Sequence, residues 1–132
     1  MPVFVRVSAV DWADGGWDLP QTIALARELK EIGIDMVDCS SGGAVPEAKI
    51  PAGPGFQAPF AAAIRREAGI ATGAVGWITE PAQAEQIVST GLADAVLIGR
   101  EFLRDPYWPL HAARSLGVDI PWPSQYERAM PL

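Results

Sequence analysis

The alternation of short apolar runs with helical patterns is the feature that most constrains the fold of this chain. Four apolar runs rich in β-forming residues, each followed by helical spacing, occupy residues 3–8, 35–41, 69–76 and 93–98. Short strands that alternate with amphipathic helices predict a parallel sheet with right-handed crossovers. The strands are apolar on both faces, as buried parallel strands are. Two architectures fit this pattern: a small open α/β sandwich, or half of an eight-stranded barrel.

Capping residues set the expected ends of the helices. Asp18 is expected to cap the first helix, and Gly69 to end the second. Thr79 is expected to cap the third helix, which has a proline in its first turn. The last helix is expected to begin near Pro106, and the proline-rich residues 118–132 to form an extended arm.

Length and composition narrow the class of protein. The chain has 132 residues, enough for one domain with a real core, and its formal net charge is -6. That charge argues against nucleic acid or an anionic membrane as a partner, and no run has the length of a membrane span. Cys39 is the single cysteine, is expected to be a small core residue, and suits a cytoplasmic protein. Because the sequence passes almost directly from Met1 into a strand, we expect a truncated chain.

The ends of the last two strands carry an unusual combination of glycine and arginine. The glycines that follow these strands are Gly73, Gly76 and Gly99. Such residues let an anion approach backbone N–H groups, and Arg100 adds a planar fork that can hold two phosphate oxygens. The pattern therefore favours a phosphate site on two successive strand–helix loops. In the alternative interpretation the glycines only turn the chain, and Arg100 pairs with Glu101 or Asp94.

Arg6 is a sharper anomaly, because it interrupts an apolar strand. An unpaired charge inside a buried strand costs several kcal/mol by the usual order of magnitude, so Arg6 requires a partner. Asp38 on the neighbouring strand, Asp11, or a bound ligand could serve. The structural interpretation is an Arg6–Asp38 ion pair. The functional interpretation is a cation that faces an electron-rich ring or an oxyanion.

Five segments, in order, carry a resemblance to a known family. They read "VFVRVSAVDW", "VDCSSGG", "TGAVGWIT", "DAVLIGREFLRDPYWP" and "PWPSQYERA". Together they resemble the C-terminal half of the Old Yellow Enzyme family, above all its YqjM-like or xenobiotic-reductase-like branch. The resemblance implies an FMN-dependent NAD(P)H oxidoreductase, or ene-reductase, built on a TIM barrel. It favours the half barrel, with four βα units over residues 1–117 and an arm over 118–132.

The resemblance also implies roles for individual residues. Arg6 matches the strand arginine beside the N1 and O2 edge of the flavin. Gly99 and Arg100 match the pair that binds the FMN phosphate. Arg128 resembles the C-terminal arginine that some members insert into the active site of a neighbouring subunit, which implies a homo-oligomer. Its alternative is a solvated arginine of the tail.

Further cofactor-binding positions follow from the same motifs. Gly73 and Ala74 match backbone that contributes to the phosphate site, and Ser41 and Gly42 are expected to line it. The family's catalytic histidine pair has no match, because the single histidine, His111, lies in the last helix and is expected to be structural. We therefore expect neither a catalytic residue nor a metal site in this chain.

These absences shape the expected function and partners. The chain is expected to bind FMN without turnover, while NADPH or NADH serves as reductant in the complete enzyme. The complementary N-terminal half barrel, or a second copy of the chain, is the expected partner. Two alternatives stay open: a non-catalytic FMN- or phosphate-binding module, and the C-terminal half of another phosphate-binding barrel enzyme.

Overall fold

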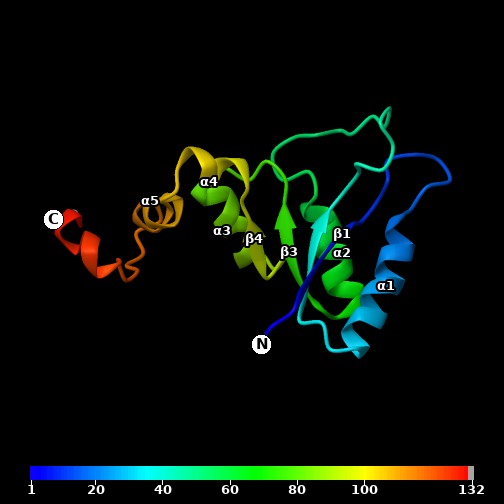
Figure 1. The fold of residues 1–132 in the computed structure, drawn as a ribbon, viewed down its shortest axis with the longest axis horizontal. Coiled ribbons are helices and arrows are strands. Elements are labelled where there is room, and N and C mark those ends of the chain that lie inside the picture. Colours follow the sequence, from blue (N-terminus) through cyan, green and yellow to red (C-terminus); the bar gives the residue numbers. More distant parts are fainter. Residues whose placement is uncertain (131–132) are drawn as a thin grey trace.

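The structure, a computed structural model that describes residues 1–130, is an α/β fold with four parallel strands that alternate with helices (Figure 1). The sheet order β1-β2-β3-β4 follows the order of the chain, so each crossover joins two neighbouring strands. The elements are β1 Phe4–Ser8, α1 Leu19–Glu31, β2 Met36–Ser40, α2 Ala58–Ala68, β3 Ala71–Val75, α3 Pro81–Ser89, β4 Ala95–Leu97, α4 Arg100–Arg104, α5 Trp108–Ser115 and the 3₁₀ helix η1 Ser124–Ala129. No helix within residues 1–130 is long and apolar enough to cross a membrane.

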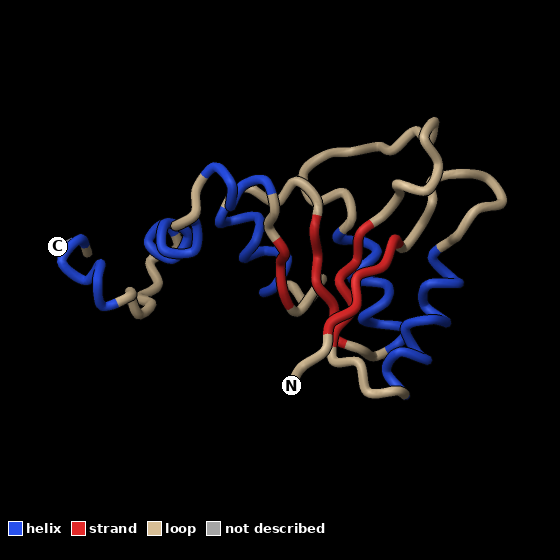
Figure 2. The backbone as a smooth tube through the Cα atoms, viewed as in Figure 1, coloured by secondary structure: helices blue, strands red, loops and turns tan. Residues whose placement is uncertain are grey.

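One face of the sheet forms the core. Val37 and Cys39 of β2 and Ala74 of β3 point to this face, are fully buried, and belong to one cluster with Ile64 of α2. α2 contacts β2 and β3, α3 contacts β4, and α1 packs against α2. Figure 2 shows the strands side by side, with these helices packed along them. We call this side the covered face.

The opposite side of the sheet, which we call the open face, lacks such a layer. The strand register places Arg6, Asp38, Gly73 and Ala95 side by side on it. Phe4 on the same face is 60% exposed. The expectation that all strands are buried on both faces is therefore wrong for β1, whose residues alternate between exposed and half-buried. The strand's own composition does not reveal what lies beyond it.

Local chemistry accounts for most helix ends. The Asp18 carboxylate accepts a hydrogen bond of 3.0 Å from the backbone N–H of Gln21, which confirms it as the cap of α1. Gly69 ends α2 in the left-handed conformation, with φ 66, also as predicted. Thr79 is not the cap of α3, because Glu80 takes that position and Pro81 is the first helical residue.

The C-terminal part of the chain departs from the prediction. Residues 100–104, for which no helix was expected, form the short helix α4, whereas α5 begins at Trp108, near Pro106 as predicted. The arm contains a helical turn, η1, where only extended chain was expected. In Figure 1 this segment projects away from the sheet. The division at residue 117 stays a prediction, and the final residues of the proposed arm, 131–132, lie outside the described part.

Candidate functional site

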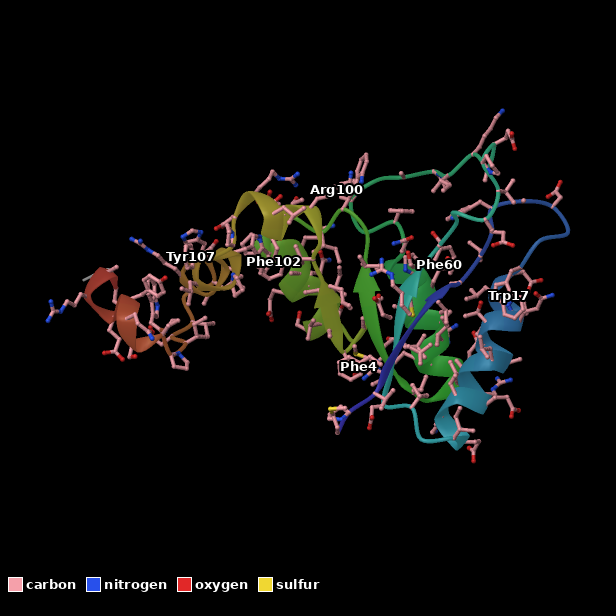
Figure 3. All side chains as sticks on the ribbon, in the orientation of Figure 1. Phe4, Trp17, Phe60, Arg100, Phe102 and Tyr107 are labelled. Carbon is pink, nitrogen blue, oxygen red and sulfur yellow. The ribbon has the colours of Figure 1, made fainter. Side chains whose placement is uncertain are left out.

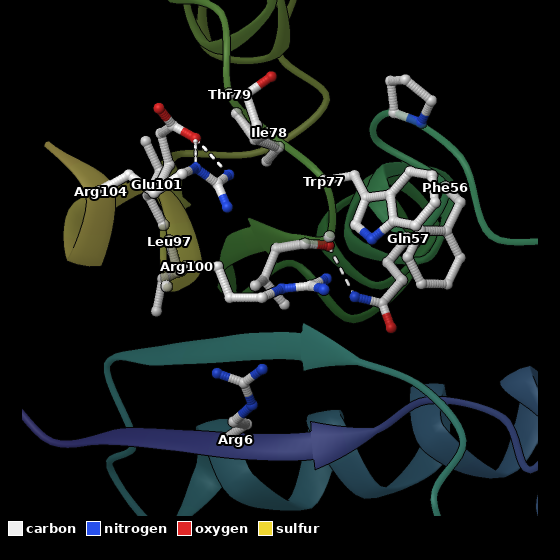
Figure 4. Close-up of a pocket in the computed structure, with 15 residues that line it drawn as sticks. Arg6, Phe56, Gln57, Trp77, Ile78, Thr79, Leu97, Arg100, Glu101 and Arg104 are labelled. Atoms are coloured by element: carbon white, nitrogen blue, oxygen red, sulfur yellow. Dashed lines mark hydrogen bonds and ion pairs between the residues drawn. The ribbon is translucent and has the colours of Figure 1, made fainter. Parts of the chain in front are cut away.

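A hollow of about 520 Å³ lies at the carboxyl ends of β3 and β4, the edge where parallel sheets place their ligands (Figure 4). Three segments form its wall: residues 75–79 after β3, residues 97–101 after β4, and the loop that contains Phe56 and Gln57. Arg6 reaches it from the open face, and Figure 4 shows this side chain rising from β1 toward the hollow.

Arg100 enters the pocket without an internal partner. Within residues 1–130 its side chain makes neither an ion pair nor a hydrogen bond. The expected alternatives are both occupied: the Glu101 carboxylate accepts from Arg104, at 2.8 Å from its Nε, and Asp94 pairs with Arg65 at 3.0 Å. The interpretation in which Arg100 is neutralised by a nearby carboxylate is therefore wrong. Figure 3 places Arg100 at the end of the sheet where the strands finish.

Arg6 has a protein partner and also lines the pocket. Its Nη1 donates to the Asp38 carboxylate at 3.0 Å, which confirms the expected ion pair, and its Nη2 lies 3.4 Å from the Ser40 hydroxyl. The other expected partner, Asp11, instead accepts from the backbone N–H of Trp17. The Arg6 side chain is 56% exposed, so the strand does not bury this charge.

The burial of Asp38 is unlike that of its partner. Its side chain is only 7% exposed, and Oδ1 has no hydrogen-bond partner among the described residues. Burial raises the pKa of this carboxyl group, while the charge and hydrogen bond of Arg6 act in the opposite direction. Cys39, the next residue of β2, points to the covered face. Burial and the Asp38 charge raise the pKa of its thiol to about 12. The thiol is therefore a protonated core group, as expected.

A partly buried relay of hydrogen bonds joins the segments that follow the first three strands. Trp12 Nε1 donates to the Ser41 hydroxyl at 2.9 Å, and that hydroxyl lies 2.6 Å from Gln57 Oε1. Gln57 Nε2 then donates to the carbonyl of Val75 at 2.7 Å. Gln57, which also lines the pocket, was missed by sequence reasoning. A glutamine among alanines gives no signal that it will be buried between three loops.

The seven predicted cofactor-binding residues fall into two groups. Three line the pocket: Arg6, Gly99 and Arg100. Four do not line it: Ser41, Gly42, Gly73 and Ala74. Ser41 belongs to the relay, Ala74 to the core, and an added Cβ at Gly73 would meet the Leu97 side chain. The cofactor roles of all seven stay predictions.

Gly76 lines the pocket and, unlike Gly73, follows the end of β3. Its φ is 122, and an added Cβ would lie 2.8 Å from Gln57 Nε2 and 2.9 Å from a Phe56 ring carbon. Only glycine permits the loop to approach the end of β3 this closely. Trp77, the next residue, is held at φ 48 and edges the pocket, whereas Trp12 does not line it. A bulky residue at positive φ is a strained arrangement that the surrounding structure must enforce.

Two other predicted positions lie away from the pocket. Arg128 is exposed on η1, and its contact with a neighbouring subunit stays a prediction. His111 on α5 pairs with Asp105, at 2.6 Å between Nδ1 and Oδ2. It is not among the residues that line the hollow, consistent with the structural role expected for it.

The residues of the pocket fit a phosphate group joined to an aromatic ring system. Gly99 has no atom within 4 Å of the position where a Cβ would lie, so a ligand can reach its backbone. Arg100 next to it offers a guanidinium that has no side-chain partner within residues 1–130 and that could hold two phosphate oxygens. Arg6 supplies a second, paired guanidinium in the same hollow, and Trp77 and Phe56 supply apolar surface. These groups could hold an anionic ligand that carries an aromatic ring.

Comparison with known protein families identifies the class of protein to which this chain belongs. The model of the NADH:flavin oxidoreductase / NADH oxidase family matches residues 1–118. The chain belongs to this family, which confirms the resemblance to the Old Yellow Enzymes.

Curated relatives agree with this assignment. The chain is 56% identical over 128 residues to an NADPH dehydrogenase of Halalkalibacterium halodurans. This alignment covers 97% of this chain and 38% of that protein. It is 51% identical over 127 residues to the NADPH dehydrogenase of Bacillus subtilis, covering 96% of this chain and 37% of that protein. The chain thus spans less than two fifths of the length of these relatives.

A solved structure supports the fold alone. Histamine dehydrogenase from Rhizobium sp. 4-9 matches with a TM-score of 0.70 and 21% sequence identity. The match covers 89% of this chain and 17% of that protein.

Proposed function

We propose that this chain supplies the phosphate-binding part of the FMN site of an NAD(P)H-dependent flavin oxidoreductase, and forms the C-terminal half of its TIM barrel. The observation that carries the proposal is the unpaired guanidinium of Arg100, beside Gly99 in a hollow at the ends of β3 and β4. Family membership favours a flavin nucleotide over another phosphate ligand for this site.

Five residues of the pocket have distinct tasks in this function. Gly99 and Arg100 would hold the phosphate through the backbone and the guanidinium fork. Arg6 would lie toward the ring and stabilise negative charge there. When bound, FMN supplies hydride transfer from a reduced nicotinamide to an activated alkene. Gly76 and Trp77 shape this side of the wall.

The chain's own residues do not complete such a reaction. The lining of the hollow contains no histidine, cysteine or tyrosine that could hold or deliver a proton to a substrate. The proton donor would come from the complementary half of the barrel. That half would pair with the unpaired edges of β1 and β4 and cover the open face, and self-association is the alternative that would cover the same surface.

Titration of the chain with FMN and with riboflavin tests the proposal. Arg100→Ala is expected to weaken FMN binding by about 1–3 kcal/mol, the range for a lost charge-assisted contact, and to leave riboflavin binding unchanged. Arg65→Ala is the matched control, because it removes the same charge from a side chain outside the pocket. Equal affinities for FMN in the parent and Arg100→Ala would remove Arg100 from the site.

A second readout separates an enzyme from a binding module. The proposal is a chain that binds FMN without turnover, because the lining of the hollow contains no histidine, cysteine or tyrosine to protonate an alkene. Reduction of the bound flavin by NADPH is a separate step that needs no such donor, so it is measured directly. For a chain that only binds FMN, the flavin absorbance of the loaded chain persists when NADPH is added without oxygen. Bleaching by NADPH would show that the chain alone also accepts the reductant.

A further inference from the structure

The two arginines of the pocket differ in their partners, and the difference rests on Asp38. Arg100 has no side-chain partner within residues 1–130, whereas Arg6 Nη1 donates to Asp38 Oδ2 at 3.0 Å. Both guanidinium groups reach the same hollow. One is therefore a free cation and the other is half of an ion pair.

The Arg6–Asp38 pair is poorly arranged for stability. Asp38 is 7% exposed and its Oδ1 is buried without a partner among the described residues, which is a costly state for a carboxylate. Its partner is 56% exposed, and an ion pair open to water gains little. Asparagine at position 38 could keep the bond to Arg6 without the buried charge. The carboxylate is therefore better explained by what it does to Arg6.

The geometry shows two effects on Arg6. Asp38 and Ser40, both on β2, contact Nη1 and Nη2 and hold the guanidinium against the open face. These contacts use two of its five N–H donors and leave others for a ligand. The carboxylate at 3.0 Å also opposes the positive charge, so a ligand meets the weaker field of an ion pair.

We propose that Asp38 is a positioning residue that fixes the Arg6 guanidinium at the pocket and moderates its charge. The inference rests on the proposed function, because it assigns the two arginines to two parts of FMN. Arg100, with its full charge, suits the phosphate, which is always anionic. Arg6, moderated by Asp38, suits a ring whose charge changes between the oxidised and reduced states. An unmoderated Arg6 would hold the reduced form too tightly relative to the oxidised form.

The ratio of the dissociation constants for oxidised and reduced FMN tests this assignment. Asp38→Asn keeps the shape and a hydrogen-bond acceptor but removes the charge, so reduced FMN should bind more tightly. We expect the ratio of the oxidised to the reduced constant to rise about tenfold, the effect of one nearby unit charge at a partly exposed site. Asp94→Asn, which removes the carboxylate of the Arg65 ion pair outside the pocket, should leave the ratio within about twofold.

A measurement without flavin tests the positioning directly. The side-chain NMR signals of Arg6, assigned by comparison with Arg6→Lys, should show slow guanidinium rotation in the parent chain. Rotation should become fast in Asp38→Ala, which removes the acceptor. Because the parent chain alone already tests whether Arg6 is held, a variant that fails to fold does not block the experiment.

The outcomes separate this inference from the proposed function. If the parent binds FMN but Asp38→Asn leaves the ratio within twofold, the inference is overturned and the proposed function stands. If the parent binds no FMN, the proposed function fails, and slow rotation of Arg6 supports only the positioning half of the inference. Fast rotation of Arg6 in the parent overturns the inference in either case.

Discussion

The covered face and the open face of the sheet take alternate residues of the same strands. On the covered face, Val37, Cys39 and Ala74 are apolar or weakly polar and fully buried beneath helices. On the open face, Phe4 is exposed and Arg6 faces the pocket. The covered face thus accounts for the stability of the chain, and the open face with the adjoining strand ends carries the groups that can bind a ligand.

The largest expected change in stability comes from deleting one apolar side chain on each side of the sheet. Ile64 of α2 lies on the covered side, and Phe4 of β1 on the open face. Ile64→Ala, at a fully buried position, should lower the free energy of unfolding by about 2–5 kcal/mol. Phe4→Ala, at a position that is 60% exposed, should change it by no more than about 0.5 kcal/mol. Urea denaturation followed by circular dichroism measures both. A large cost for Phe4→Ala that grows with protein concentration would show that a second copy covers the open face.

The next test compares two glycines of the pocket wall. Gly76→Ala should cost about 1–3 kcal/mol, because φ is 122 and the new methyl group meets Gln57 and Phe56. Gly99→Ala should change stability by less than about 0.5 kcal/mol, since no atom lies within 4 Å of its added Cβ.

Gly99→Ala, the variant with the smaller loss of stability, should show the larger loss of FMN affinity. The methyl group of Gly99→Ala would occupy the space assigned to the phosphate, so FMN affinity should fall although the fold is intact. Denaturation and FMN titration of the same two proteins give the comparison. Equal FMN affinity in the parent and in Gly99→Ala would place the phosphate elsewhere.

Features governed by neighbouring residues could be predicted from the sequence. The four strands, their parallel order, and the roles of Asp18 and Gly69 depend on local patterns and capping chemistry, and the structure confirms them. The Arg6–Asp38 pair was also foreseeable, because successive strands with a crossover lie side by side. A charge on one strand then restricts its partner to a few positions on the next.

Features that depend on distant parts of the chain could not be predicted. Residues 100–104 are too few to show helical periodicity, so α4 was missed. The position of Gln57 depends on three loops that meet only in the folded chain. The exposure of β1 depends on what lies beyond the sheet, and an apolar strand reads the same whether or not its outer face is covered.

The smallest expected effect concerns Asp38, the one buried charge of the open face. Burial raises its pKa above the ordinary 3.8, so between 3.8 and the raised pKa the folded chain binds more protons than the unfolded chain. The contribution of this group to the free energy of unfolding therefore falls as pH rises through that window. Above that window the carboxylate is charged in both states, and the full cost of its burial is present.

Asp38→Asn should consequently be more stable than the parent at pH 7, by a fraction of a kcal/mol. The difference should shrink as pH falls through the window and vanish below 3.8, where the parent's carboxyl group is neutral in both states. Urea denaturation of both proteins across this pH range measures it. A parent that is more stable at pH 7 would mean that attraction to Arg6 outweighs burial. The pair would then belong with the stabilising contacts of the covered face rather than with the binding groups of the open face.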